Sequence, residues 1–289
     1  MPSLPAFFQE YQPLVTAALE PIVPAAGPAP APVLEAMRYT LLAPSKRVRA
    51  VLVLLSAELC GTAARAMPAA CAIEAVHAAS LMLDDLPSMD DAPLRRGRTS
   101  AHVAFGEAVT ILAAFGLLNE AYRHVAQKYE AAVAQKITTL LADAVGLDGL
   151  IAGQAEDVLA TDSAIDFDTL ERIHRRKTGV LFGAAATAGA LTAGGRPDDV
   201  VALAAYAKNL GLAFQIVDDL LDVTGTEAET GKVVRTDARK MTFVSFSGVG
   251  GARALAGELC HTAQAALKPF GRRAARLNEL ADFVADRRL

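Results

Sequence analysis

The chain has 289 residues, 53% of them hydrophobic and 21% charged, so it can bury a large core and is not a disordered segment. Its net charge is −4 and no basic block exceeds three residues, which excludes the cationic footprint of a nucleic-acid-binding protein. Three cysteines, an odd number without metal-ligand spacing to a histidine, argue against a disulfide framework. The expected partner is therefore a small molecule.

The N-terminal segment carries no targeting signal that we recognise. It lacks a basic region followed by an apolar run and a small-residue cleavage site, so we expect no secretory signal. Long apolar stretches are interrupted by a charge, Gly or Pro before ~18–20 residues accumulate, so we expect no membrane span. Residues 1–32 are interpreted as an N-terminal helix followed by a Pro/Ala-rich segment. Together these features predict a cytoplasmic protein.

Helical periodicity dominates the rest of the chain. Apolar residues recur every three or four positions, as in residues 103–118, and alternating strand-like runs are scarce. Alanine-rich segments favour helices and let them pack closely. Breaks at residues 194–197 and 225–239 do not separate halves of different composition. We predict an all-α fold, a single domain over residues 1–289, with about ten helices or more around a large central cavity.

Two acidic motifs interrupt apolar helical sequence. The first contains Asp84, Asp85 and Asp90, and Pro87 should end its helix so that Asp90 turns back toward the same cavity. In the second, Asp218 and Asp222 are four residues apart on one helix face, with Asp219 beside them. Like charges at this spacing destabilise a helix by roughly 0.2–0.5 kcal/mol, and burial adds to the cost.

A divalent cation would compensate for these carboxylates. Oxygen ligands suit a hard ion such as Mg²⁺, which is usually shared between one or two carboxylates and a substrate phosphate. Two acidic motifs facing one another would therefore hold a metal-bound diphosphate. A solvated helix end explains a single motif of this kind, but two motifs, each flanked by apolar sequence, favour the metal site.

Basic residues lie near both motifs and suit a second, metal-free anion, because Arg forks and Lys point charges bind phosphate oxygens directly. Each one alone is most simply a surface charge. They are residues 46–49, residues 95–98, the Lys177-Thr178-Gly179 segment, Lys232 and Lys240.

Residues 74–98 resemble the first aspartate-rich region of trans-isoprenyl diphosphate synthases, and residues 211–222 resemble the second. Residues 153–157 and 174–179 also match that family in order and spacing. The resemblance extends from about residue 35 to the C-terminus and is closest to bacterial geranylgeranyl diphosphate synthases of carotenoid pathways. It implies the helical bundle of isoprenoid synthases. It also implies a homodimer, with the helix around residues 103–126 as a candidate interface.

The resemblance also implies a reaction and its substrates. The expected reaction is head-to-tail condensation of isopentenyl diphosphate with an allylic diphosphate, with about three Mg²⁺ ions, or Mn²⁺ in their place. The implied metal ligands are Asp84, Asp85, Asp90, Asp218, Asp219 and Asp222. The allylic diphosphate would contact Arg95, Lys177, Thr178, Gln215, Lys232 and Lys240, and isopentenyl diphosphate would contact Lys46, Arg49, His77 and Arg96. The residues expected to act most directly in catalysis are Asp84, Asp85, Lys177, Asp218 and Lys232.

Two segments depart from the family pattern. The family usually has Gly-Gly before the Lys-Arg-x-Arg-Pro run, where this chain has Pro44-Ser45 before it and Ala50 after it. Losing the glycines restricts how closely the backbone approaches a phosphate. The segment 231–242 also differs, near positions 239 and 241.

Two small residues predict the product length. Ala79 and Ser80 lie about one helical turn (~5.4 Å) before Asp84, where a prenyl tail would descend. An aromatic residue there marks fifteen-carbon producers in the family, whereas small residues leave room for another five-carbon unit, so a twenty-carbon product is expected. Phe115 and Leu118 are the candidate floor of the cavity. Ordinary packing in an Ala-rich helix is the competing explanation for the small residues.

Three other functions remain as alternatives: a farnesyl diphosphate synthase, a terpene cyclase and a low-activity regulatory subunit of a heteromeric synthase. Cyclases usually replace the second aspartate cluster and line the pocket with aromatics. This chain keeps Asp218, Asp219 and Asp222, and only 6% of its residues are aromatic. Head-to-head synthases lack the context of residues 153–157 and 177–179. A catalytic synthase is therefore the favoured interpretation.

Overall fold

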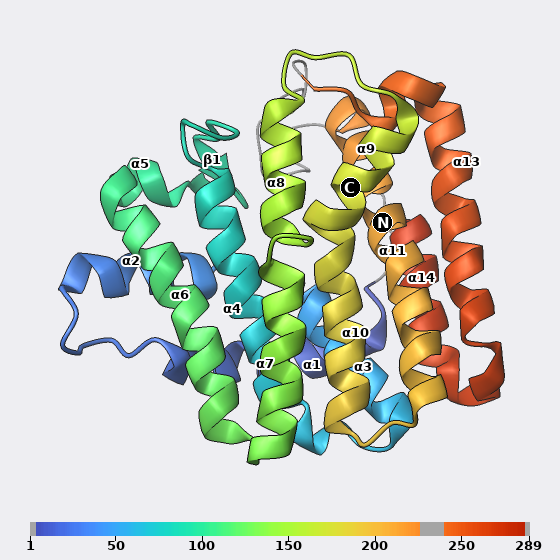
Figure 1. Ribbon diagram of the computed structural model, residues 1–289, viewed down its shortest axis with the longest axis horizontal. Coiled ribbons are helices and arrows are strands. Elements are labelled where there is room, and N and C mark those ends of the chain that lie inside the picture. Colours follow the sequence, from blue (N-terminus) through green and yellow to red (C-terminus); the bar gives the residue numbers. More distant parts are fainter. Residues whose placement is uncertain (1–3, 226–239, 287–289) are drawn as a thin grey trace.

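The structure is a computed structural model that describes residues 4–225 and 240–286. The described chain is almost entirely helical, as predicted, and its long helices run roughly side by side (Figure 1). The α-helices are α1 (Ala6–Leu19), α2 (Ala31–Leu41), α3 (Val48–Cys60), α4 (Met67–Asp84), α5 (Ala101–Phe105), α6 (Glu107–Lys128), α7 (Ala131–Val145), α8 (Leu150–Leu159), α9 (Phe167–His174), α10 (Val180–Thr192), α11 (Pro197–Thr224), α13 (Phe243–Ala266) and α14 (Ala275–Ala285).

Shorter elements connect these helices. Three 3₁₀-helices are η1 (Glu20–Ile22), η2 (Ala63–Arg65) and η5 (Lys268–Ala274), and η3 (Arg175–Gly179) is a π-helical turn between α9 and α10. A small antiparallel hairpin pairs β1 (Leu94–Arg95) with β2 (Arg98–Thr99). The hairpin follows α4 directly, so it lies next to the first acidic motif.

Helices α3 and α10 form the centre of the bundle. Ala50 to Leu55 of α3 are all buried, and α10 is buried over most of its length, which is typical of a helix covered on every side. The two helices pack against each other, and α4 and α11 pack against them in turn. A Cβ at Gly189 would lie 2.2 Å from the Val53 carbonyl oxygen, so α10 can approach α3 this closely only with glycine there.

A second apolar cluster joins α9, α11 and α13. Phe243 is completely buried in it, together with Ile216 and Leu170. Helix α11 is long and apolar enough to cross a membrane, but half of its most apolar segment is buried inside the protein. Packing against α10 and α13 therefore accounts for its composition.

The first acidic motif ends its helix as predicted. Helix α4 stops at Asp84, before Pro87, and the chain then turns so that the Asp90 amide donates to the Asp84 carbonyl at 2.9 Å. The hairpin is held against α2, because the Tyr39 hydroxyl donates to the Thr99 carbonyl and Arg98 stacks 3.9 Å from the Tyr39 ring centroid. The turn after α4 places Asp90 where it pairs with Lys240 at 2.7 Å.

Two glycines let neighbouring helices approach the π-helical turn. A Cβ at Gly153 of α8 would lie 2.3 Å from the Lys177 backbone nitrogen, and one at Gly211 of α11 would lie 2.9 Å from the Gly179 Cα. A π-turn inside an α-helix is rare and is frequent at functional sites. Close packing on both sides fixes the position of the turn that carries Lys177.

We expect Gly153→Ala to lower the free energy of unfolding by ~1–3 kcal/mol, because the added methyl group overlaps the backbone of the π-turn. Gly183→Ala is the matched control, since no heavy atom lies within 4 Å of the added Cβ and alanine favours the helix. Urea unfolding of both variants measures the difference. Equal stability of the two variants would contradict the close approach of α8.

Candidate functional site

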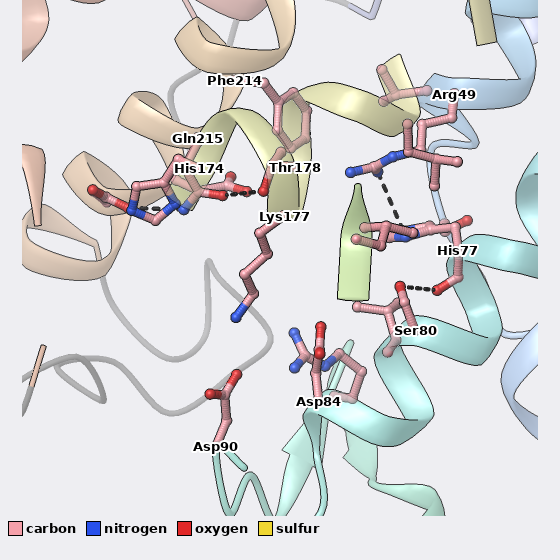
Figure 2. A pocket seen from close by; sticks show the side chains of 18 of the residues that line it. Arg49, His77, Ser80, Asp84, Asp90, His174, Lys177, Thr178, Phe214 and Gln215 are labelled. Carbon is pink, nitrogen blue, oxygen red and sulfur yellow. Dashed lines mark hydrogen bonds between the residues drawn. The ribbon is translucent and has the colours of Figure 1, made fainter. Parts of the chain in front are cut away.

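A cavity of about 460 Å³ opens where α3, α4, the π-turn η3, α11 and the start of α13 converge. Most of the residues predicted to form the site line this cavity. They are Lys46, Arg49, His77, Ser80, Asp84, Asp90, Arg95, Arg96, Lys177, Thr178, Gln215, Asp218, Asp219 and Lys240. Figure 2 shows Asp84 and Asp90 at one end of the cavity and Arg49 and His77 at the other, with Lys177 extending toward the acids.

One face of α4 forms a wall of the cavity. Glu74, His77, Ser80 and Asp84 recur at three- and four-residue intervals, which places their side chains on one side of the helix. Burial raises the pKa of Asp84 to about 6, although the positive charge of Lys177 opposes the rise. Asp84 is therefore a carboxylate whose charge the protein alone does not fully compensate.

Asp85 points away from the cavity lining. Its Oδ1 accepts a hydrogen bond from Arg95 Nε at 2.9 Å and a second, shorter one from the same guanidinium. Burial raises the pKa of Asp85 above its ordinary value, and the Arg95 pair offsets only part of that rise. In this structure Asp85 therefore anchors Arg95, while its assignment as a metal ligand stays a prediction.

The second acidic motif is part of a hydrogen-bond chain across three elements. Thr178 Oγ1 donates to Gln215 Oε1 at 2.8 Å, and Gln215 Nε2 donates to Asp219 Oδ1 at 2.9 Å. Asp219 Oδ2 accepts from the Phe243 amide at 3.0 Å, at the start of α13. Asp219 thus fixes α13 against α11, and Asp218 is the member of the motif that lies half-buried in the cavity wall.

Two lysines share one buried carboxylate between the acidic motifs. Asp157 Oδ2 lies 2.7 Å from both Lys177 Nζ and Lys240 Nζ, and Lys240 Nζ also lies 2.7 Å from Asp90 Oδ1. Burial raises the pKa of Asp157, but the two lysines outweigh it and hold that pKa below its ordinary value. Burial likewise lowers the pKa of Lys177, yet Asp84, Asp157 and Asp90 raise it above its ordinary value. The lysines are therefore fully charged near neutral pH.

The opposite end of the cavity is cationic. Arg49 lies 4.7 Å from the Phe182 ring centroid and its Nη1 is 3.3 Å from His77 Nε2. Burial, then the charges of Arg49 and Arg96, hold the pKa of His77 well below its ordinary value, so the ring is neutral. Lys46 lies 5.5 Å from the Phe283 ring centroid at the rim. This end suits an anion without a metal.

Several predicted residues lie outside the cavity lining. Lys232 lies outside the described residues. Asp222 is buried on α11, and Ala79 is buried in the core cluster beside Ser80. Phe115 is 61% exposed on α6, so the suggestion that it floors the cavity was wrong, because α6 turns that side chain away from the core. Leu118 is partly buried and packs against the core.

Sequence reasoning missed other residues that line the cavity. Asp157 was noted only as a part of a family motif, although an aspartate inside an apolar helix was a usable signal. His174 lies 5.3 Å from the Phe243 ring, and burial lowers its pKa to about 4. Arg47 and Glu74 form a buried ion pair in the wall of the cationic end, which no local pattern revealed.

The acidic end has the chemistry of a magnesium site that a ligand completes. Asp84, Asp90 and Asp218 present carboxylate oxygens to the cavity, which are the donors that Mg²⁺ prefers. Among the described residues, no three acidic, His or Cys side chains lie close enough to hold a metal by themselves. Mg²⁺ characteristically uses one or two carboxylates and takes its remaining ligands from phosphates and water. The residues present therefore fit Mg²⁺ bound together with a diphosphate.

Comparison with known proteins gives the family. The sequence model of the polyprenyl synthetase family matches residues 30–251. The large subunit 1 of the heterodimeric geranylgeranyl pyrophosphate synthase of Arabidopsis thaliana chloroplasts is 40% identical over 286 residues, which cover 95% of this chain and 76% of that protein.

Two solved structures share the fold over nearly the whole length. An FPP/GFPP synthase from Zymomonas mobilis is 32% identical with a TM-score of 0.86, and the match covers 97% of this chain and 98% of that one. A geranyltransferase from Helicobacter pylori, complexed with magnesium and isoprenyl diphosphate, is 25% identical with a TM-score of 0.86 and coverage of 98% and 97%. This chain belongs to the polyprenyl synthetase family of head-to-tail prenyltransferases.

Proposed function

We propose that this protein is a Mg²⁺-dependent geranylgeranyl diphosphate synthase that condenses isopentenyl diphosphate with an allylic diphosphate. The observation that carries the proposal is one cavity with carboxylates and lysines at one end, arginines at the other and the small Ser80 on the wall between them. The Arabidopsis relative is named a geranylgeranyl pyrophosphate synthase and the Zymomonas structure an FPP/GFPP synthase. These names imply different products. The proposal of a twenty-carbon product therefore rests on the small side chain of Ser80 on α4.

The acidic end would bind the allylic diphosphate. Asp84, Asp90 and Asp218 would hold Mg²⁺, which supplies Lewis-acid stabilisation of the leaving diphosphate when bound. Lys177 and Lys240 would donate to the same diphosphate oxygens, because Asp157 already holds both ammonium groups at 2.7 Å in this region. Charge placed in advance where negative charge develops is the main source of acceleration in such a reaction.

The cationic end would place the second substrate for attack. Lys46, Arg49 and Arg96 would hold isopentenyl diphosphate with its double bond facing the allylic carbon. The allylic C–O bond would break with its electron pair leaving on the diphosphate, the isopentenyl double bond would form the new C–C bond, and transfer of a proton to the departing diphosphate would restore the alkene. Leu81, Leu181 and Phe214 line the cavity between the two ends and exclude water that would trap the allylic cation.

A farnesyl diphosphate synthase is the second candidate, and the FPP/GFPP description of the Zymomonas structure favours it. It would use the same residues and the same steps and stop one five-carbon unit earlier. The regulatory-subunit alternative would keep diphosphate binding without turnover. Product analysis separates all three.

We expect the purified protein with Mg²⁺, isopentenyl diphosphate and a fifteen-carbon, ten-carbon or five-carbon allylic primer to yield a twenty-carbon product. The prenyl alcohols released by phosphatase identify it. EDTA should abolish turnover, and Asp84→Asn should lower kcat by ~10²-fold or more, because it removes a carboxylate that would hold the Mg²⁺ stabilising the leaving diphosphate. A fifteen-carbon product would move the proposal to the farnesyl synthase, and binding without any product would support the regulatory subunit.

Ser80 gives a sharper test of chain length than Ala79, because Ser80 lines the cavity whereas Ala79 is only 4% exposed and would overpack if enlarged. Ser80→Phe should shorten the main product by at least one five-carbon unit. Ser80→Ala is the matched control and should keep the wild-type product. The same product from Ser80→Phe as from wild type would remove α4 as the wall that sets the length.

We also propose that a second copy of this chain covers the exposed apolar side of α6. Leu112 and Phe115, one helical turn apart on α6, are 59% and 61% exposed. A single exposed apolar residue is ordinary, but two large ones on the same side of one helix favour a partner. The segment 103–126 was the interface predicted from the resemblance.

Light scattering after size exclusion tests this interface. We expect wild type to run as a dimer and the double variant Leu112→Glu/Phe115→Glu to run as a monomer, because two buried charges would oppose association. Val201→Glu is the control, since Val201 is 68% exposed on α11, away from this face. A dimer that survives the double substitution would show that the interface lies elsewhere.

A further inference from the structure

We infer that the buried Arg47–Glu74 ion pair is a positioning device for isopentenyl diphosphate, an inference that rests on the proposed function above. The two side chains are almost completely inaccessible, with 2% and 3% exposure, and they form part of the wall at the cationic end of the cavity. Glu74 was not predicted to act in the site, and Arg47 was predicted only as one of the basic residues 46–49. Their neighbours Lys46, Arg49 and His77 are the residues expected to hold the second substrate.

Arg47 joins two backbone carbonyls and one carboxylate. Its Nη1 lies 3.3 Å from Glu74 Oε2 on α4, and its Nη2 donates to the Leu41 and Ala43 carbonyls at 2.8 and 3.0 Å. The guanidinium fork therefore joins the end of α2 and the segment after it to the middle of α4. A lysine could not make this set of bonds, because it lacks the planar fork.

Glu74 also forms a hydrogen bond to α3. Its other oxygen, Oε1, accepts a hydrogen bond from the Ala50 amide at 3.2 Å. Ala50 lies in the first turn of α3, where backbone amides have no partner within the helix and where a negative charge is favoured. Glu74 thus caps α3 from a neighbouring helix and binds Arg47 at the same time.

The conformation of Arg47 shows what this pair achieves. Its backbone is left-handed, with φ 54° and ψ 37°, a region that residues other than glycine rarely adopt unless their surroundings hold them there. At this turn the Arg47 guanidinium bonds to Glu74 and to the Leu41 and Ala43 carbonyls in the cavity wall, with Lys46 and Arg49 lining the cavity on either side of it in the chain. Pro44 and Ser45 precede this turn where the family usually has glycines, so the backbone here is less free to adjust. The ion pair holds the turn in its left-handed conformation.

Stability alone does not explain this arrangement. A buried ion pair can often be replaced by apolar residues of similar volume without loss of stability, whereas removing one partner leaves an uncompensated charge. The pair is therefore better understood through the geometry that it imposes on Lys46 and Arg49. The two roles predict different behaviour when both charges are removed together.

The test compares Arg47→Met/Glu74→Leu with wild type. The double variant should unfold at a temperature close to that of wild type, while its affinity for isopentenyl diphosphate falls on the order of tenfold or more because the cations lose their alignment. Calorimetric titration with isopentenyl diphosphate alone measures this without turnover. Steady-state assays should then show a raised KM for isopentenyl diphosphate and an allylic KM within about twofold of wild type.

Two further variants keep the result interpretable. Glu74→Gln keeps the shape of the side chain and removes its charge, so it should also weaken isopentenyl diphosphate binding if the double variant does not fold. Tyr206→Phe is the control, because Tyr206 donates a buried hydrogen bond of 2.6 Å to the Leu277 carbonyl and does not line the cavity. It should lower stability and leave both KM values unchanged.

The outcomes separate this inference from the proposed function. Wild-type affinity for isopentenyl diphosphate in the folded double variant, or in Glu74→Gln, would overturn the positioning role and leave the synthase intact. An equal rise in both KM values would overturn it as well, because a general loosening of the site would then suffice. A wild-type protein that binds no isopentenyl diphosphate would overturn the proposed function itself.

Discussion

Asp84 is a buried carboxylate at the cavity end of α4, with Asp90 and Asp85 adding to its negative surroundings, and the rest of the site is arranged around that charge. Asp84 is held where burial raises its pKa to about 6, a position that a core side chain would otherwise fill. Lys177 and Lys240 offset part of the charge, and Asp157 keeps both lysines in place at 2.7 Å. Part of the negative charge of these carboxylates remains uncompensated by the protein. The Mg²⁺ of a metal-bound diphosphate would compensate for it.

Holding those charges in place requires a rigid frame, and glycine contacts provide it. Helix α8 can approach the π-turn only because Gly153 has no side chain, and that turn carries Lys177 and Thr178. On the other side, the bonds from Thr178 through Gln215 to Asp219 reach the first amide of α13. A shift of either helix would therefore move the lysine, the carboxylate or both.

The two ends of the cavity differ in how they would bind an anion, one through a metal ion and the other directly. At the acidic end the charges are shared with a ligand, so the protein needs carboxylates and lysines whose geometry a metal and a diphosphate complete. At the cationic end Arg49 is stacked on Phe182 and held beside a neutral His77. Arg47 and Glu74 form a nearly inaccessible neutral pair in the same wall, so the net positive charge at this end comes from the other cations. The apolar wall between them suits the hydrocarbon part of the substrates.

The sequence by itself determined the helical fold, the two acidic motifs, most of the cationic residues and the end of α4 before Pro87. These follow from local rules, because helical spacing decides which side chains share a face and residue type decides what they can bind. Only the tertiary structure decided that Asp85 pairs with Arg95, that Asp219 holds the Phe243 amide and that Asp157 joins two lysines. It also turned Phe115 outward and buried Arg47 against Glu74. Most of these partners lie about 20 to more than 80 residues apart in the chain, and a local pattern carries no information about which distant side chain will meet a buried charge.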